Sequence, residues 1–468
     1  MNRHYQARRR FLKRSLACAV AGSGAGAMTG KLNLVGSALA DSYAGVSDYK
    51  ALVCVFLYGG SDSFNLFVPS DETLQGQYRT ARNSLSIDHA DLLPAADGIV
   101  SFNQQLPNLK ALYEGGDAAV IANVGNLVSP VNRTDLINGS AVIPADLFAH
   151  NHQQEQWQKA LSSQPASVVG AGWGGRMADL LRDANANATL PPSFSVAGSN
   201  YFQPGNVTTP VAVDPRYGPK LMDYMDSSKY GSNAGRESAM ARILALQNDH
   251  LLQQFAGESF ARARDSSVLL TQVMEQHPAS AYDFSTSGSI GSQLQMVARL
   301  IAGRETMGQK RQIFFVGMGG WDTHDAQSIR LSQLAADLDK GLSSFQAEMQ
   351  AQGLADPDGS DQVTTFTASD FGRTLTVNGD GSDHGWGGHY FVMGGAVNGG
   401  QLIGDWPSYV IGGEDDTADK GRVIPSMSVN QYGAALASWM GLSDSDINSI
   451  FPDLANFDSS WKNYGLFN

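Results

Sequence analysis

The sequence is poor in cysteine, in basic side chains and in long apolar runs. Only Cys18 and Cys54 are cysteines among the 468 residues, and Cys54 lies in the apolar run 51–57, where we expect a buried, unreactive thiol. After residue 40, no stretch is long and apolar enough to predict a transmembrane helix. The formal net charge of −13 argues against nucleic acid as a ligand, because phosphate binding requires a basic face.

The first 40 residues have the features of an export signal. The segment 8–13 reads Arg-Arg-Arg-Phe-Leu-Lys, which matches the twin-arginine pattern, and 38–40 reads Ala-Leu-Ala, a small-residue cleavage site. We therefore expect the twin-arginine export machinery to carry residues 41–468, already folded, to the periplasm or outside the cell. The signal holds seven basic and no acidic residues, so its removal moves the formal charge from −13 to −20. It also leaves Cys54 as the single cysteine, which excludes an intramolecular disulfide.

Short apolar segments alternate with helical patterns along the rest of the chain. Four β-branched or aromatic runs end in Gly-rich or polar turns, and these are 51–58, 118–124, 312–317 and 363–367. Apolar residues recur at helical spacing over 327–352. The stretch 217–306 has few strand signals, and we interpret it as a largely helical insertion or cap. The alternation predicts an α/β domain over 41–468, with a mixed, mostly parallel central sheet flanked by helices.

Side chains able to bind metal or transfer protons are concentrated in four short segments. These are 58–65 with Asp62, 148–157 with His150 and His152, 319–325 with Asp322 and His324, and 382–389 with Asp383, His384 and His389. The first and third directly follow predicted strands, where ligands collect in open α/β sheets. Five of the eight histidines outside the signal lie in the last three segments, and each of these segments also carries at least one carboxylate.

This clustering predicts a site for one or two divalent ions, which we expect to be zinc, manganese or calcium. Two of the segments are also compatible with a purely structural role. The segment 58–65 is also compatible with an ordinary turn, and 148–157 with a helix cap that carries surface histidines.

Motifs in and between these segments resemble those of one protein family. They include Gly-Gly-Ser-Asp at 59–62, Gly-Trp-Gly-Gly-Arg at 172–176, Gly-Trp-Asp-Thr-His at 320–324, Phe-Gly-Arg-Thr at 371–374 and Asp-His-Gly-Trp-Gly at 383–387. Further matches lie at 150–157, 404–407 and 451–452. With these motifs in order, the chain resembles the domain of unknown function 1501 (DUF1501) family of secreted bacterial proteins. It resembles, more distantly, the alkaline phosphatase and sulfatase superfamily, which implies an alkaline-phosphatase-like sheet with metals at strand ends.

The distant resemblance also implies a set of metal ligands. Carried over by motif, they are Asp62, Asp322, His324, Asp383, His384 and His389. The spacing Asp322-x-His324 is tighter than the superfamily's usual Asp-x-x-x-His, and this departure argues against the binding of one ion by both side chains. A second departure concerns the nucleophile, because relatives commonly have Ser-His where this chain has Ala149-His150. Water activated by the metal would then be required, or one of the substitutes Ser61, Ser63 and Ser369, which the sequence does not rank.

The predicted activity is the metal-dependent hydrolysis of phosphate or sulfate esters, on a small molecule or a polymer. His150 and His152 are candidate ligands or acid–base groups, and Arg373 and Arg176 are candidate clamps for the substrate anion. Structural salt bridges to Asp370 or Glu155 are the alternative for the two arginines.

A non-catalytic function is the main alternative. The chain would then be a secreted binding or matrix protein that keeps the fold and a structural metal. A redox enzyme is disfavoured, because the exported chain has one cysteine and no dinucleotide-binding fingerprint.

Overall fold

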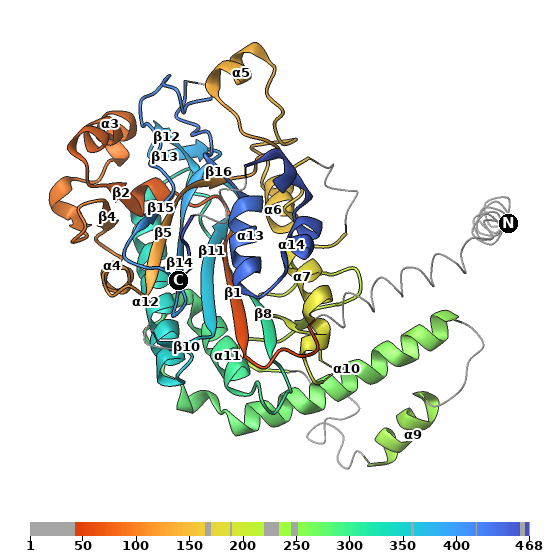
Figure 1. Cartoon of the computed structure of the whole chain (residues 1–468). Coiled ribbons are helices and arrows are strands. Elements are labelled where there is room, and N and C mark those ends of the chain that lie inside the picture. Colours follow the sequence, from red (N-terminus) through yellow and green to blue (C-terminus); the bar gives the residue numbers. More distant parts are fainter. Residues whose placement is uncertain are drawn as a thin grey trace, which may run out of the picture. The chain divides into compact units, whose positions relative to one another are not determined.

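The computed structural model describes residues 43–163, 170–187, 190–219, 234–244, 251–356, 360–417, 419–458 and 464–467 (Figure 1). The chain divides into two compact units, Met1–Val46 and Ser47–Asn468. The predicted twin-arginine segment lies outside the described residues, and the described part of the first unit is a short turn that begins at Tyr43. The features below belong to the second unit.

A nine-stranded sheet forms the centre of this unit, in the order β15-β5-β14-β11-β1-β8-β6-β7 with β16 paired to β5. Its strands are β1 (Lys50–Leu57), β5 (Ala118–Gly125), β6 (Ser193–Ser195), β7 (Val211–Ala212), β8 (Arg311–Met318), β11 (Val363–Ser369), β14 (Gly388–Gly394), β15 (Leu402–Ile403) and β16 (Met427–Ser428). Among the sheet strands described, β14 alone pairs antiparallel with its neighbours, β5 and β11. The predicted mixed, mostly parallel sheet is therefore confirmed, and the four predicted runs form β1, β5, β8 and β11.

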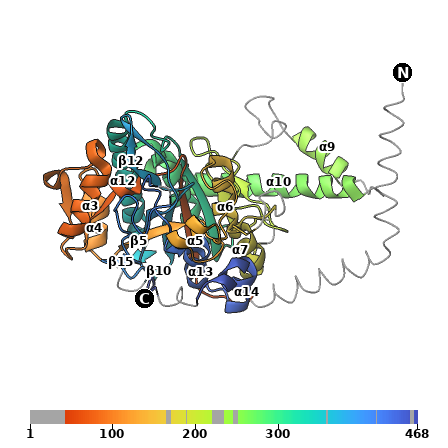
Figure 2. The same cartoon turned by 90° about the horizontal axis from the view of Figure 1, so that it is seen from above.

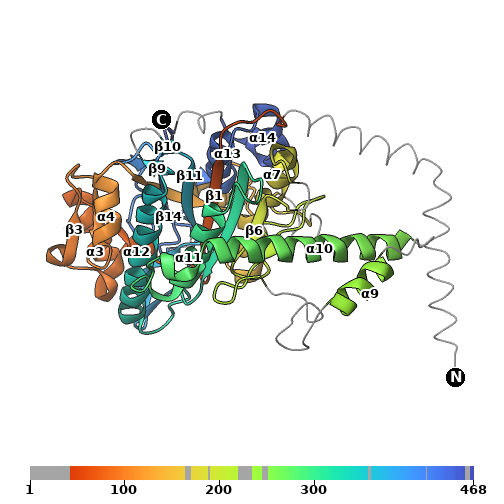
Figure 3. The same cartoon turned by 90° about the horizontal axis from the view of Figure 1, so that it is seen from below.

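Helices flank both faces of the sheet (Figure 2). One face carries α4 (Pro107–Glu114), α11 (Gly291–Ala302) and α12 (Gln327–Ala351), and the other carries α6 (His150–Lys159), α7 (Trp173–Leu181), α13 (Val429–Trp439) and α14 (Asp444–Ile450). The helix predicted at 327–352 is α12. Figure 3 shows α10 (Leu251–Gln276) beside α11 and extending beyond it, with α9 (Ala234–Leu244) near its far end. The predicted helical content of 217–306 is thus present in its described parts, while its separation as an insertion stays a prediction.

The central strand β1 is apolar from Ala51 to Leu57 because both of its faces are covered there. Its side chains alternate in direction, so Ala51, Val53, Val55 and Leu57 pack in one apolar cluster with residues of α11 and α12. Phe56 faces the other layer and meets Trp157 of α6, with the ring centroids 6.1 Å apart. Burial of one such large side chain contributes about 1.5–3 kcal/mol. A strand of this kind has no solvent-exposed face on which polar residues would alternate with apolar ones. The sequence therefore predicts it from a continuous apolar run.

Smaller elements surround the sheet. They are α3 (Glu72–Arg82), a sheet of β2 (Phe67–Pro69), β3 (Leu92–Pro94) and β4 (Val100–Asn103), α5 (Arg133–Asn138), the pair β9 (Ala355–Asp356) and β10 (Ser360–Asp361), and the hairpin β12 (Arg373–Asn378) and β13 (Gly381–His384). The hairpin follows β11 directly and carries part of the candidate site. None of the described helices has both the length and the apolar character that a bilayer crossing requires.

Candidate metal centre

Loops at the carboxyl ends of three neighbouring strands frame the candidate site. β1 pairs in parallel with both β8 and β11, so the loops that follow these strands meet at one edge of the sheet. Gly59 follows β1 with φ of 119°, and a Cβ there would lie 2.4 Å from the backbone nitrogen of Asp322 in the loop after β8. A glycine is therefore needed for the two loops to approach this closely.

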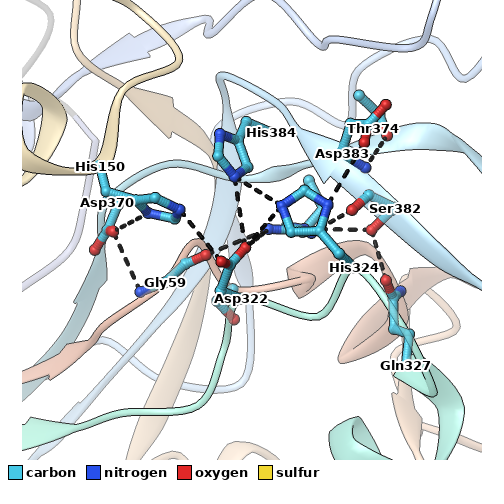
Figure 4. A network of polar contacts seen from close by, with 12 residues as sticks. Gly59, His150, Asp322, His324, Gln327, Asp370, Thr374, Ser382, Asp383 and His384 are labelled. Carbon is cyan, nitrogen blue, oxygen red and sulfur yellow. Dashed lines mark hydrogen bonds and ion pairs between the residues drawn. The ribbon is translucent and has the colours of Figure 1, made fainter. Parts of the chain in front are cut away.

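Four side chains meet within this frame, and we call them the Asp322 cluster: Asp322, His150, His324 and His384 (Figure 4). Asp322 Oδ1 lies 3.0 Å from His324 Nε2 and 3.5 Å from His384 Nε2. The other carboxylate oxygen, Oδ2, lies 3.5 Å from His150 Nε2. The Nε2 atoms of His324 and His384 are 3.0 Å apart. Three imidazoles from three separate elements thus direct the same ring nitrogen toward one carboxylate.

Each imidazole of the cluster has an oxygen at its other ring nitrogen. His150 Nδ1 lies 2.8 Å from Asp370 Oδ2, and His384 Nδ1 lies 2.8 Å from the carbonyl oxygen of Phe148. His324 Nδ1 lies 3.5 Å from Asp383 Oδ1. Because a carbonyl oxygen only accepts, neutral His384 donates from Nδ1 and presents the lone pair of Nε2 to the cluster. Metal-binding histidines typically have such outer partners, which fix the tautomer and the ring orientation.

The hairpin β12–β13 reaches the cluster because of a second glycine. A Cβ on Gly381 would lie 2.2 Å from the carbonyl carbon of His324. The backbone nitrogen of Ser382 also donates to the carbonyl of Thr323, at 3.3 Å. The hairpin therefore lies directly against the loop after β8, and His384 at its end joins the cluster.

The charges of the cluster favour an ionised carboxylate surrounded by imidazoles. Burial alone would raise the pKa of Asp322, but a hydrogen bond and the charge of Arg373 lower it below its usual value. The hydrogen bond to Asp370 raises the pKa of His150, against the effect of burial. Burial lowers the pKa of His384, although the bond to Phe148 opposes this.

The geometry fits a divalent metal ion. In a tetrahedral zinc site, bonds of about 2.0–2.2 Å place neighbouring ligand atoms roughly 3.3 Å apart. Asp322 Oδ1, His324 Nε2 and His384 Nε2 form a triangle with edges of 3.0, 3.5 and 3.0 Å. Ligand atoms of His150, Asp322 and His384 also lie within 4.8 Å of one another. The tight spacing Asp322-x-His324 therefore does not prevent the two side chains from converging.

Comparison with known proteins places the chain in a family. A sequence model described as "Protein of unknown function (DUF1501)" matches residues 49–418. The chain belongs to the DUF1501 family. No curated protein matches it. The lipoteichoic acid synthase LtaP from Listeria monocytogenes is a similar solved structure, with a TM-score of 0.35 and 10% identity, covering 90% of this chain and 81% of that one. A likeness this weak transfers no activity.

Arg373 of the DUF1501 protein, predicted as an anion clamp or a structural salt bridge, lies buried against Asp322. Its Nη1 donates to Asp322 Oδ1 at 2.8 Å and to the carbonyl of Gly59 at 3.4 Å. Its Nε and Nη2 donate to the hydroxyl and the carbonyl of Ser382. All three nitrogens therefore have partners in the protein, and the side chain is fully buried, so the structure supports the structural alternative for Arg373, with Asp322 as its ion-pair partner.

Arg176 has a similar structural role. Its guanidinium donates to the carbonyl oxygens of Ala171, Lys159 and Ile450, at 2.6–2.8 Å. Burial lowers the pKa of Arg176 to about 10. These hydrogen bonds hold the start of α7 against the ends of α6 and α14. Arg176 thus binds main-chain carbonyls in the structure, instead of the carboxylate expected for a salt bridge or an anion expected for a clamp.

Asp62 was expected to bind metal, but in the structure it is the counter-charge of a buried arginine. It forms an ion pair with Arg82, and both side chains are completely buried. It also accepts a hydrogen bond from Gln327, which in turn accepts from the Ser382 hydroxyl at 2.6 Å. Burial raises the pKa of Asp62 despite the opposing charge of Arg82. Asp62 therefore connects to Arg373 through Gln327 and Ser382, and no described hydrogen bond or ion pair joins it directly to the Asp322 cluster.

Three further predicted residues also lie outside the cluster. His389 is buried, and its Nδ1 accepts from the backbone nitrogen of Asn123 while its Nε2 donates to the hydroxyl of Tyr409, both at 3.1 Å. Both of its ring nitrogens are thus committed, and burial lowers its pKa to about 3. His152 pairs with Asp146 at 2.6 Å. Asp383 supports His324 from outside, and a hydrogen bond from Asn378 is the largest cause of its lowered pKa.

Asp370 is the functional candidate that the sequence analysis missed as part of the site. It is buried directly after β11, and its Oδ2 accepts from His150 Nδ1 and Gln154 Nε2 at 2.8 Å and from the backbone nitrogen of Gly59 at 3.2 Å. The strand-end rule that identified Asp322 applies equally to Asp370. The carbonyl of Phe148 had no such signal, because a backbone acceptor carries no sequence signature.

Proposed function

We propose that this DUF1501 protein is an exported metal-dependent hydrolase of phosphate or sulfate esters, active in the periplasm or outside the cell. The observation that carries the proposal is the convergence of three imidazole Nε2 atoms on the Asp322 carboxylate. Asp322, His324 and His384 would hold one ion, with His150 as a further ligand or a proton-transfer group. Zinc or manganese suits this nitrogen-rich donor set better than calcium, which prefers oxygen ligands.

Each residue of the cluster would have a distinct task. When bound, the ion would polarise an ester oxygen and stabilise the negative charge that develops during hydrolysis. Asp370 orients His150, and Arg373 keeps Asp322 ionised and in position. The side chains of Asp322 and His324 are 45% and 41% exposed, so a solute can reach the cluster from solvent.

The attacking group in this proposal is water. In the described part of the chain, no serine or threonine hydroxyl forms a hydrogen bond with a side chain of the Asp322 cluster. Ser61 is buried, Ser63 accepts from the backbone of His389, and Ser369 donates to the carbonyl of Leu57. Ala149 is the N-cap of α6 and supplies no hydroxyl.

The test is elemental analysis combined with an ester screen. We expect the purified chain to carry at least one equivalent of zinc or manganese, and Asp322→Ala and His384→Ala to lose it while keeping the native circular dichroism. His89→Ala is the matched control, because His89 is exposed and outside the cluster. Nitrophenyl phosphate, bis(nitrophenyl) phosphate and nitrophenyl sulfate should reveal turnover that a chelator removes and the metal restores. Folded protein that binds no divalent ion, or bound metal without turnover on any ester, would contradict the hydrolase.

A secreted binding or matrix protein with a structural metal is the second candidate. Ala149 favours it, together with the absence of a hydroxyl at the cluster in the described residues. The two functions differ in what metal removal does. A structural metal predicts a lower unfolding temperature and no lost activity, whereas the hydrolase predicts lost turnover in protein that remains folded.

A further inference from the structure

A single arginine contacts both partners of the hydrogen bond that fixes His384. The guanidinium of Arg422 lies over the ring of Phe148, 3.9 Å from its centroid. Its Nε donates to the main-chain carbonyl of His384 at 3.0 Å. Phe148 and His384 are themselves joined by the bond from His384 Nδ1 to the Phe148 carbonyl. Arg422, Phe148 and His384 therefore form a closed triangle beside the candidate metal centre.

Each side of this triangle restrains a different degree of freedom. The stacked guanidinium holds Phe148 in the segment that leads into α6, and with it the carbonyl that His384 uses. The bond to the His384 carbonyl holds the end of β13. Together they fix both the backbone of His384 and the acceptor that selects its tautomer, as outer partners of metal-binding histidines do.

Arg422 is itself anchored at its backbone. Its own nitrogen donates to Asp416 Oδ1 at 3.2 Å, and the nitrogen of Gly421 donates to Asp416 Oδ2 at 2.9 Å. Asp416 is buried, so these bonds are shielded from water. The base of the Arg422 side chain is therefore fixed in the loop between β15 and β16, and the restraint on His384 originates from a third part of the chain.

We infer that Arg422 is a positioning residue for the metal centre, which sets the direction of His384 Nε2 through Phe148 and the His384 main chain. The inference rests on the proposed metal site, since the direction of His384 Nε2 matters to function only if this nitrogen binds a metal ion. Lysine cannot replace Arg422, because an ammonium group has neither the planar face nor the fixed donor geometry of a guanidinium.

The test measures metal affinity and the spectrum of a cobalt(II) probe in the full chain. We expect Arg422→Ala to weaken zinc binding about 10- to 100-fold and to change the cobalt(II) visible spectrum, which reports the ligand geometry. The metal-free variant should unfold at nearly the temperature of the metal-free wild type. Arg79→Ala, which removes an exposed arginine of α3, should change neither the affinity nor the spectrum. Arg422→Lys should resemble Arg422→Ala although it preserves the charge.

The outcomes separate this inference from the proposed function. Wild-type affinity and spectrum in Arg422→Ala would overturn the positioning role and leave the metal site standing. If Arg422→Ala does not fold, Arg422→Lys and Phe148→Leu are measured instead. Unchanged cobalt(II) spectra in both of these variants would also overturn the positioning role. A wild-type chain that binds no zinc or cobalt would refute the proposed function, and the positioning role with it.

Discussion

Removal of the charge of Asp62 tests whether this residue stabilises the fold or binds the metal. Asp62→Asn would leave Arg82 charged and buried without its carboxylate partner. Loss of one partner of a buried ion pair typically costs about 3–5 kcal/mol. Arg82 keeps two other acceptors, the carbonyl of Thr374 at 2.7 Å and Asn65 Oδ1 at 3.1 Å. Burial also raises the pKa of Asp62 despite Arg82, so desolvation already offsets much of the attraction. We therefore expect a loss near the lower limit, about 3 kcal/mol.

The assay is urea unfolding followed by tryptophan fluorescence, with metal content measured on the same preparations. The midpoint should fall while the bound metal stays at the wild-type level, because Asp62 faces Arg82 and Gln327 instead of the Asp322 cluster. A double variant, Asp62→Leu with Arg82→Met, should recover part of the loss, because no unpaired charge remains buried. Asp88→Asn, at an exposed position, is the control and should change stability by less than about 0.5 kcal/mol.

The reverse pattern would refute this reasoning. If Asp62→Asn lost the metal and kept the wild-type unfolding midpoint, Asp62 would be a ligand, as the resemblance to the superfamily implied. An equal loss in the single and double variants would show that the volume or the hydrogen bonds at the position matter more than the charge.

Three further predictions concern stability and reactivity. The pKa of His389 falls from the usual 6.5 to about 3, so the unfolded chain binds a proton that the folded chain does not. The contribution of neutral His389 to the free energy of unfolding is complete above pH 6.5 and is lost as the pH falls toward 3. The free energy of unfolding, measured from pH 7.5 to 4, should therefore depend less on pH in His389→Gln than in the wild type. Gly172→Ala should cost about 1–3 kcal/mol, because its Cβ would lie 2.1 Å from two carbonyl oxygens, whereas Gly170→Ala, with no atom within 4 Å, should be nearly neutral in the same urea assay. Burial raises the pKa of the Cys54 thiol, so in a chain lacking residues 1–40 a thiol reagent should label it only after denaturation, and labelling of native protein would contradict its burial.

The sheet could be predicted because its inner strands satisfy one simple condition. The strand β1, covered on both faces, is apolar at every position from Ala51 to Leu57, and few other elements of that length share this pattern. The strands β5, β8 and β11 are likewise buried at nearly every position and rich in apolar or β-branched residues, although β8 begins with Arg311 and Gln312 and β11 carries threonines at 364, 365 and 367. The antiparallel direction of β14 was not predictable, since direction depends on the connection and not on the strand's own residues. The short strands β7, β15 and β16 have two residues each and carry no periodicity to read.

The candidate site was predictable only where position and chemistry coincide in the sequence. Asp322 follows a strand end, and His150 and His384 stand beside other polar residues in short segments. Asp62 meets the same criteria, yet it pairs with Arg82, which lies 20 residues away at the end of α3. His389 likewise meets Asn123 and Tyr409 from distant segments. A carboxylate or imidazole that follows a strand end is thus predicted to lie near the site. Which side chain it pairs with depends on tertiary packing, which no local sequence pattern encodes.

The spacing of Asp322 and His324 shows how such packing decides which candidate ligands meet. Two residues apart on an extended strand, their side chains would share a direction but lie well over 5 Å apart along the chain. Here the loop folds back, since the nitrogen of Thr323 donates to the carbonyl of Trp321 at 3.0 Å, and Trp321 is held in turn by the carbonyl of Tyr58. This turn brings Asp322 Oδ1 within 3.0 Å of His324 Nε2. A shorter motif can therefore bring the same pair of candidate ligands together as a longer one when β1 anchors the turn. For such candidates, spacing within one loop is thus a weaker criterion than the strand end from which the loop departs.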